Sequence, residues 1–336
     1  MTDHLDAHLS NDLSGHGPSD WLSRNNKARC RVCGLVVAAS RGVHPRCRAS
    51  DRAAQPVVSP IPQTVPSPQE ASNLPTLDQV FTSRRSTFRH VPHRARRRWA
   101  QTLIRALAIV VLHNTVSAWT ELLMLPKCVL CTPPSKGPKS NNRTAAAYTL
   151  DRLSRWEAGE RASLWAAYPA EHTPPKLPNT VEARENRATK LCREGMDGKS
   201  CAALTSDGLS KANHATLTEV RRLHPPAPAQ GRTPASSLAL PPDLPPELVA
   251  RMLRSFPAGT APGPSGFRAQ HLLDALAPAY RTTVIEQLAG VTSLLARGAA
   301  PQVLAPHLAG AKLFAADKKD GGVRPIAVGE ILRRLG

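Results

Sequence analysis

"GAKLFAAD" (residues 310–317) and "GVRPIAV" (residues 322–328) are two short apolar segments on either side of a polar turn. Short apolar runs bounded by Gly or Asp are typical of strands. The turn contains Asp320 and Gly321, a pair that adopts positive φ at low cost, as the primed turns of tight hairpins require. The sequence therefore predicts a β-hairpin over residues 310–328.

Three cations surround this turn: Lys318 and Lys319 lie on it and Arg324 follows it. Arg324 precedes Pro325, and a residue before proline avoids the helical region. Its backbone is therefore extended and the direction of its side chain is set locally. Cations at a hairpin tip can reach phosphate groups while they stay in water. A solvated surface turn without a ligand is the alternative interpretation.

Two amphipathic helices are predicted before the hairpin. In "PSGFRAQHLLDALA" (residues 264–277), Ser265 can act as the N-cap of a helix. The apolar residues expected on one face of that helix are Ala269, Leu272, Leu273 and Leu276. The helical spacing of apolar residues is clearest from Tyr280 to Ala296, where these residues are Val284, Leu288, Val291 and Leu295. The C-terminal region therefore predicts an α+β arrangement.

Helical periodicity also dominates the middle of the chain. Residues from Trp99 to Leu125 predict one or two helices that end at Pro126. The pattern repeats more weakly over 146–166 and from Val181 to Leu191. These observations predict a mostly α protein.

The composition argues against one large core. The chain has 336 residues and 32 prolines, nearly twice the usual frequency of about 5%, and aromatic residues make up only 4%. Proline clusters favour extended, disordered linkers over packed elements. We expect a disordered tail at 1–29, a zinc-finger-like segment at 30–50, a Pro-rich then Arg-rich linker at 51–98, a helical region at 99–215, a Pro-rich linker at 216–247 and the α+β segment at 248–336.

The charge balance points to a polyanionic partner. Lys and Arg number 44 against 25 acidic residues, a surplus of 19, and such a field concentrates RNA or DNA around a protein. The alternatives are a disordered basic chain and a translated fragment whose charge reflects base composition alone. The longest apolar stretch, "ALAIVVL" at 106–112, is far shorter than the roughly 20 residues that a membrane-spanning helix needs. We expect no membrane partner.

Four residues near the N-terminus have the spacing of a metal site. Cys30, Cys33, His44 and Cys47 form a C-x2-C-x10-H-x2-C pattern. Two close pairs of thiolate or imidazole ligands joined by a short loop suit tetrahedral Zn²⁺. The spacing predicts a small structural zinc finger. Free thiols and a surface histidine are the alternative.

Two further features carry weaker signals. Cys128 and Cys131 form a CxxC pair that could bind metal or act in redox chemistry, but we favour packing in a helical core. The segment "HRARRR" contains Arg94, Arg96, Arg97 and Arg98, which fit a nuclear localisation signal or an arm that contacts phosphates. Seven cysteines, an odd number, and the absence of a signal-peptide pattern favour a reducing compartment, the nucleus or the cytoplasm.

Several segments resemble one protein family. "SFPAGTAPGPSGFRAQHLLDAL" (255–276) and "AGAKLFAADKKDGGVRPIAVGEILRRL" (309–335) resemble the start of the reverse transcriptase domain of eukaryotic retrotransposons. "LLMLPKCVLCTPP" (122–134) and "LDRLSRWEAGERASLW" (150–165) look like the region that such polyproteins carry upstream of the polymerase. A zinc finger before that region is similar to some non-LTR elements.

The resemblance implies a C-terminal α+β part of the fingers subdomain. It implies that Lys318, Lys319 and Arg324 bind the triphosphate of an incoming nucleotide. It also implies that Pro262, Gly263, Ser265 and Gly266 lie near the template backbone. In that family, palm aspartates hold two Mg²⁺ ions for polymerisation.

This sequence contains no Asp-Asp pair, so we expect Mg²⁺ only in a complete homologue and no catalytic residue here. The expected function is that of a truncated reverse-transcriptase-like protein that binds nucleic acid and does not polymerise it alone. The alternatives are a stand-alone zinc-finger and basic nucleic-acid-binding protein, or a non-functional retroelement fragment.

Overall fold

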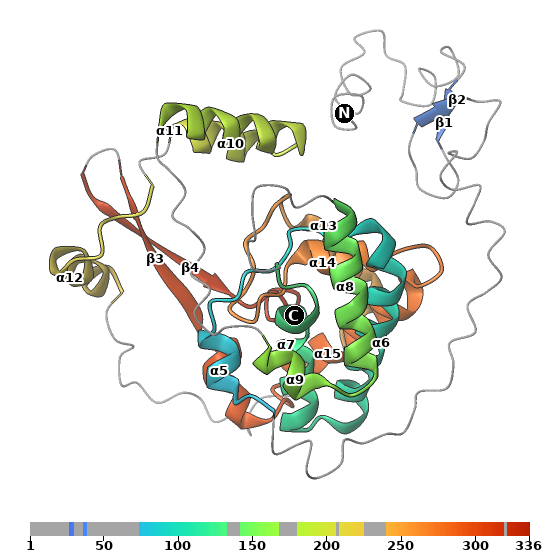
Figure 1. Cartoon of the computed structure of the whole chain (residues 1–336). Coiled ribbons are helices and arrows are strands. Elements are labelled where there is room, and N and C mark those ends of the chain that lie inside the picture. The colour runs from blue at the N-terminus through green and yellow to red at the C-terminus, as the bar shows by residue number, and fades with distance from the viewer. Residues whose placement is uncertain are drawn as a thin grey trace, which may run out of the picture. The chain divides into compact units, whose positions relative to one another are not determined.

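A computed structural model describes residues 27–29, 36–38, 74–132, 142–167, 180–205, 208–224, 240–318 and 321–336. The chain divides into two compact units, residues 1–61 and 62–336. In the first unit, β1 (Lys27–Arg29) pairs antiparallel with β2 (Val36–Ala38). Helices make up most of the described structure, which confirms the prediction of a mostly α protein (Figure 1).

The described helices of the second unit are α5 (Leu77–Thr82), α6 (Arg96–His113), α7 (Val116–Val129), α8 (Asn142–Glu157), α9 (Arg161–Ala166), α10 (Val181–Arg193), α11 (Asp197–Thr205), α12 (His214–Leu223), α13 (Pro246–Ser255), α14 (Ala269–Asp274), α15 (Arg281–Ala296) and α16 (Ala305–Ala309). Two 3-10 turns, η2 (His93–Ala95) and η4 (Gln302–Leu304), precede α6 and α16. The predicted hairpin is confirmed: β3 (Ala311–Asp317) pairs antiparallel with β4 (Val323–Gly329).

A regular apolar stripe buries one face of α6. Among its large side chains, those of Trp99, Leu103, Leu107 and Val110 have no exposed surface. Asn114 ends the helix at φ 47°, in the left-handed region that asparagine tolerates better than most residues. Its Nδ2 donates to the Ala299 carbonyl at 2.7 Å, and its Oδ1 accepts from Trp119 Nε1 at 2.9 Å. The residue that ends α6 therefore also ties it to α7 and to the loop after α15.

Helix α7 continues through Pro126, so the prediction that this proline ends the helix is wrong. Proline removes one helical hydrogen bond and costs about 3 kcal/mol in a helix interior. Every residue of α7 from Ala118 to Val129 is buried. Each fully buried leucine contributes roughly 1.5–3 kcal/mol, and α7 has three between Leu122 and Leu125. Packing therefore outweighs the cost of the proline.

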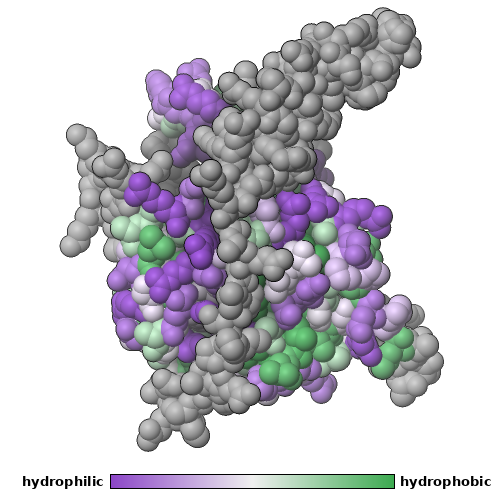
Figure 2. Space-filling view, turned by 90° about the vertical axis from the view of Figure 1, so that its right-hand side faces the viewer, coloured by the Kyte–Doolittle hydropathy of each residue, from purple (hydrophilic) through white to green (hydrophobic). Residues whose placement is uncertain are grey.

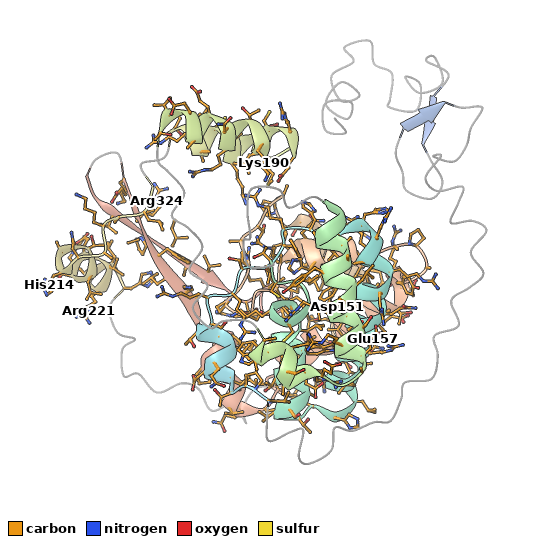
Figure 3. All side chains as sticks on the ribbon, viewed as in Figure 1. Asp151, Glu157, Lys190, His214, Arg221 and Arg324 are labelled. Carbon is orange, nitrogen blue, oxygen red and sulfur yellow. The ribbon has the colours of Figure 1, made fainter. Side chains whose placement is uncertain are left out.

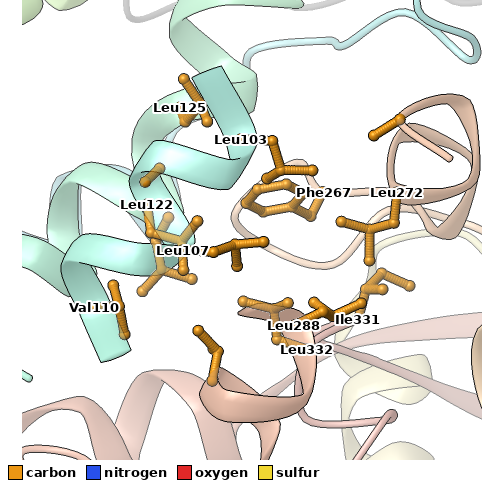
Figure 4. Close-up of a cluster of buried hydrophobic side chains, with 14 of the residues drawn as sticks. Leu103, Leu107, Val110, Leu122, Leu125, Phe267, Leu272, Leu288, Ile331 and Leu332 are labelled. Carbon is orange, nitrogen blue, oxygen red and sulfur yellow. The ribbon is translucent and has the colours of Figure 1, made fainter. Parts of the chain in front are cut away.

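One hydrophobic core joins the middle and the end of the chain. Helix α6 packs against α15, and α15 packs against α13. Figure 4 shows side chains of α6 and α7 meeting Phe267, Leu288 and Ile331 in one cluster. The expected division into separate domains on either side of 216–247 differs from this arrangement, because the apolar faces of the two regions cover each other.

The described parts of the two expected linkers also contain ordered elements. Leu77 and Val80 of α5 are buried in the core, and Thr87 forms an isolated β-bridge with Cys131. Helix α12 lies across the start of the second linker. Among the coloured residues in Figure 2, hydrophilic side chains predominate and hydrophobic ones form patches between them, as expected when most large apolar side chains are buried in the core.

Candidate nucleic-acid interface

The hairpin presents cations and an aromatic ring on one side. In the register of β3 and β4, Phe314 lies opposite Ile326 and Ala316 lies opposite Arg324. Because side chains alternate along a strand, Lys312, Phe314 and Arg324 share one face. Lys312 Nζ lies 5.7 Å from the centre of the Phe314 ring, a cation–π arrangement.

The turn is closed by two backbone hydrogen bonds. Lys318 N donates to the Gly322 carbonyl at 2.8 Å, and Gly321 N donates to the Lys318 carbonyl at 3.1 Å. Gly321 has φ 79°, a positive value that glycine adopts without strain. The side chain of Lys318 is exposed, and Lys319 and Asp320 lie outside the described residues.

Helix α12 extends the hairpin surface. Leu209 forms a β-bridge with Ala316, which places the segment before α12 along the free edge of β3, and α12 itself contacts β4. Asn213 caps the helix by accepting from Thr216 N at 2.9 Å. Figure 3 shows Arg324 on the hairpin and Arg221 on the neighbouring α12. Local sequence patterns do not predict this contact, because it joins segments about 100 residues apart.

This surface carries an excess of unpaired positive charge. Residues 208–224, 311–318 and 321–329 contain six Lys or Arg side chains and two acidic ones. Glu219 pairs with Arg222 at 2.7 Å. Within the described ranges, four of the cations form no side-chain hydrogen bond and no direct ion pair: Lys211, Arg221, Lys318 and Arg324. We refer to the β3–β4 hairpin and α12 together as the cationic hairpin surface.

The arginine block is arranged differently. Arg96 pairs with the buried Asp274 at 2.8 Å, and Arg98 pairs with Glu157 at 2.7 Å. Arg97 Nε donates to the Tyr280 hydroxyl at 3.2 Å. Among the described residues, Arg94 is the one member of the four that is exposed and makes no such contact. The expectation of an arm that contacts phosphates does not fit Arg96, Arg97 and Arg98, because they form the first turn of α6 and bind acidic and hydroxyl groups of the fold. The nuclear localisation signal stays a prediction.

The loop expected to lie near a template is mostly buried. Gly263, Ser265 and Gly266 are inside the protein, and Pro262 is half-buried. Ser265 donates from its backbone N and, at 2.8 Å, from its hydroxyl to the carboxylate of Glu330. Since Glu330 takes both donors, Ser265 does not cap a helix, and α14 begins only at Ala269. The predicted helix start is wrong, and direct template contact by Ser265 does not fit its burial.

Lys127 holds the same loop from the other side. It is 2% exposed, and its Nζ donates to the carbonyls of Val80, Ser83 at 2.9 Å and Pro264 at 2.7 Å. Three carbonyl oxygens match the three N–H groups of an ammonium ion. We call Lys127, Ser265 and Glu330 the buried junction. A single lysine within the apolar run 122–131 was the signal that sequence reasoning missed.

Burial moves the two charged groups of the junction toward their neutral forms. It lowers the pKa of Lys127 to about 7, while the negative charge of Glu330 acts in the opposite direction. Burial raises the pKa of Glu330, and the hydrogen bonds from Ser265 oppose that rise. Glu330 follows β4 directly, so the junction fixes the base of the hairpin to the loop at 263–266.

The cysteine pair in α7 and just after it is part of the core. Cys128 and Cys131 are fully buried, and Cys131 Sγ lies 3.6 Å from the Tyr148 hydroxyl. Burial raises the pKa of Cys128 to about 12 and that of Cys131 as well, so both thiols are poor nucleophiles. The expectation of packed thiols is confirmed.

Metal binding was predicted for Cys30, Cys33, His44 and Cys47, which lie outside the described residues. Among the residues that the structure does describe, no group of three or more His, Cys, Asp or Glu side chains could hold a metal ion.

No protein-family model, curated protein or solved structure matches the chain. In the described part of the chain, none of the helices combines the length and the apolar character that crossing a membrane requires.

Proposed function

We propose that this protein binds nucleic acid through the cationic hairpin surface. The observation that carries the proposal is the contrast between two sets of cations. Three of the four arginines at the start of α6 are bound within the fold, whereas Lys318, Arg324 and Arg221 are exposed and unpaired among the described residues. Unpaired cations on one surface attract the phosphate backbone and release its counterions on binding.

The composition of the surface favours a single strand over a duplex. Phe314 and Ile326 lie opposite each other between Lys312 and Arg324, and Ile326 is 41% exposed. An aromatic ring flanked by cations suits base stacking with simultaneous phosphate contacts, which is a common mode of single-strand binding.

The resemblance to reverse transcriptases supports the same surface. In that family the matching hairpin belongs to the fingers, and Lys318 or Lys319 with Arg324 would contact a triphosphate. We include a reverse-transcriptase-like fingers element in the proposal, with RNA or DNA as the partner and no polymerisation by the described residues. The zinc finger of Cys30, Cys33, His44 and Cys47 remains a further proposal based on ligand spacing.

The proposal is tested by removing three charges from the surface. We expect Lys312→Gln/Lys318→Gln/Arg324→Gln to weaken binding of a labelled single-stranded oligonucleotide at least about tenfold. The slope of log affinity against log salt should fall by about 2, since each phosphate contact on a single strand contributes about 0.7. Fluorescence anisotropy at several salt concentrations measures both quantities.

The control removes the same charge elsewhere. Arg251, Arg254 and Arg281 are exposed on α13 and α15, and their triple Gln variant changes the net charge equally. Equal losses in the two variants would show that only the overall charge matters. Absence of binding by the unaltered protein at low salt would refute the function itself.

A further inference from the structure

A second group of cations lies around the loop that follows α13. Arg268 stands between the buried loop and α14 and is half-buried. Its Nε is buried without a hydrogen-bond partner, and within the described residues its guanidinium forms no hydrogen bond or ion pair. A buried donor without an acceptor costs about 1–3 kcal/mol. This position therefore favours an acceptor that comes from outside the fold.

Arg89 acts on Arg268, and both of these arginines act on Lys199. Burial first, and then the positive charge of Arg89, lower the pKa of Arg268 to about 10. Burial, Arg89 and Arg268 together lower the pKa of Lys199. His271 links the two arginine positions: its Nε2 lies 2.7 Å from the carbonyl of Phe88, the residue before Arg89, and its Nδ1 lies 3.4 Å from the backbone N of Arg268. The acidic group in contact is Glu194, whose carboxylate lies 3.0 Å from Arg89 Nη1, so positive charge remains in excess.

Three separate segments build this group. Arg89 lies in the loop before η2, Lys199 lies in the first turn of α11, and Arg268 follows the loop at 263–267. Lys199 Nζ donates to the carbonyl of Gly259. Gly259 has φ 67°, and a Cβ there would meet the sulfur of Met196 and the ammonium of Lys199, so glycine lets α11 approach the loop.

We propose that Arg89, Lys199 and Arg268 form a binding site for a phosphate group. Guanidinium groups donate in a planar fork that matches phosphate oxygens, and a lysine adds a compact charge beside them. A bound phosphate relieves the repulsion among the three cations and provides the acceptor that Arg268 lacks. The phosphate belongs to a nucleic-acid backbone or is free in solution, and the nucleic-acid source rests on the proposed function.

The first experiment compares Arg268→Gln with Arg251→Gln, an exposed control that changes the charge equally. We expect Arg268→Gln to weaken oligonucleotide binding several-fold and to lower the salt slope by about 0.7, while the control matches the unaltered protein. In phosphate-free buffer, Arg268→Gln should also raise Tm, because one of the repelling charges is gone. A lower Tm would indicate a structural arginine and overturn the proposal.

The second experiment uses inorganic phosphate and does not depend on nucleic-acid binding. Phosphate should raise Tm of the unaltered protein above its value in chloride at equal ionic strength, and less so for Arg268→Gln and Lys199→Gln. Stabilisation by phosphate without oligonucleotide binding would support the site with free phosphate as its ligand while refuting the proposed function. If Arg268→Gln matches the unaltered protein in both experiments and Lys199→Gln matches it in the second, the site is refuted and the cationic hairpin surface is unaffected.

Discussion

Lys127 fixes the position of the loop that carries Pro264, because its ammonium group has three carbonyl acceptors and one of them belongs to that loop. Its ammonium donates to three carbonyls from two separate segments; the bond to Val80 is buried, and those to Ser83 and Pro264 are partly buried. A buried charge is tolerated only when its hydrogen bonds are satisfied and an opposite charge is near. Burial lowers the pKa of Lys127 to about 7, and the three carbonyls and the charge of Glu330 favour its protonated form against that burial.

We expect Lys127→Met to destabilise the protein by about 3–5 kcal/mol, since the change leaves Glu330 buried without its counter-charge and the carbonyls without donors. Urea unfolding followed by circular dichroism measures the free energy. Lys190→Met, at an exposed position of α10, is the control and should change it by less than about 0.5 kcal/mol. The double variant Lys127→Met/Glu330→Gln should lose less free energy of unfolding than the two single variants lose together. Simple additivity of the two losses would show that the residues do not interact.

His271 makes the stability depend on acidity. It is fully buried, its Nε2 lies 2.7 Å from the Phe88 carbonyl, and its Nδ1 lies 3.4 Å from the backbone N of Arg268, as suits a neutral ring. Burial lowers its pKa to about 3, the Phe88 carbonyl opposes this, and the charges of Arg268 and His90 add to it. Below the ordinary pKa of about 6.5, the unfolded chain binds a proton that the folded chain does not.

The contribution of His271 to the free energy of unfolding should therefore fall by about 1.4 kcal/mol for each pH unit below 6.5, until the folded ring is itself protonated near pH 3. Urea titrations between pH 7 and pH 4.5 measure this slope. His271→Gln should be less stable at pH 7 and should show a shallower slope, whereas His113→Gln, at an exposed position, should retain it. An unchanged slope in His271→Gln would contradict this account.

At the scale of the elements, sequence analysis predicted the helices and strands that are determined by local residue patterns. The hairpin and α15 are confirmed, and Val284, Leu288 and Val291 are buried as their spacing indicated. Local rules failed where a distant group competed with them. Ser265 does not cap a helix because Glu330, 65 residues away, accepts its hydrogen bonds, and Pro126 does not end α7 because packing outweighs the lost bond.

The candidate site likewise has features that local sequence patterns predict and features that they do not. Lys318 and Arg324 were predicted on a hairpin tip from neighbouring residues alone, and the structure places Lys318 just after β3 and Arg324 in β4. The contribution of α12, the pairing of Arg98 with Glu157 and the group of Arg89, Lys199 and Arg268 depend on contacts between distant segments. Periodicity and turn chemistry carry no information about such contacts.

For the whole molecule, the shared core means that the two halves of the second unit depend on each other. Val284 and Leu288 of α15 have no exposed surface, and α6 covers that helix. Without α6 and α7, several such side chains would be exposed to water, and each exposure would cost roughly 1.5–3 kcal/mol of stability. Domains of this size are stable by only about 5–15 kcal/mol, so the loss of one half is sufficient to unfold the other.

We therefore expect residues 240–336 expressed alone to show no cooperative unfolding transition and to be digested rapidly by protease, whereas residues 74–336 should unfold in one transition. Urea titration followed by circular dichroism and limited proteolysis with mass spectrometry provide the two measurements. Mixing 240–336 with a separate 74–224 chain should restore protection, because the missing apolar faces are supplied again. If 240–336 unfolds cooperatively with the midpoint of the longer chain, its core is independent and the expected boundary at 216–247 separates two domains after all.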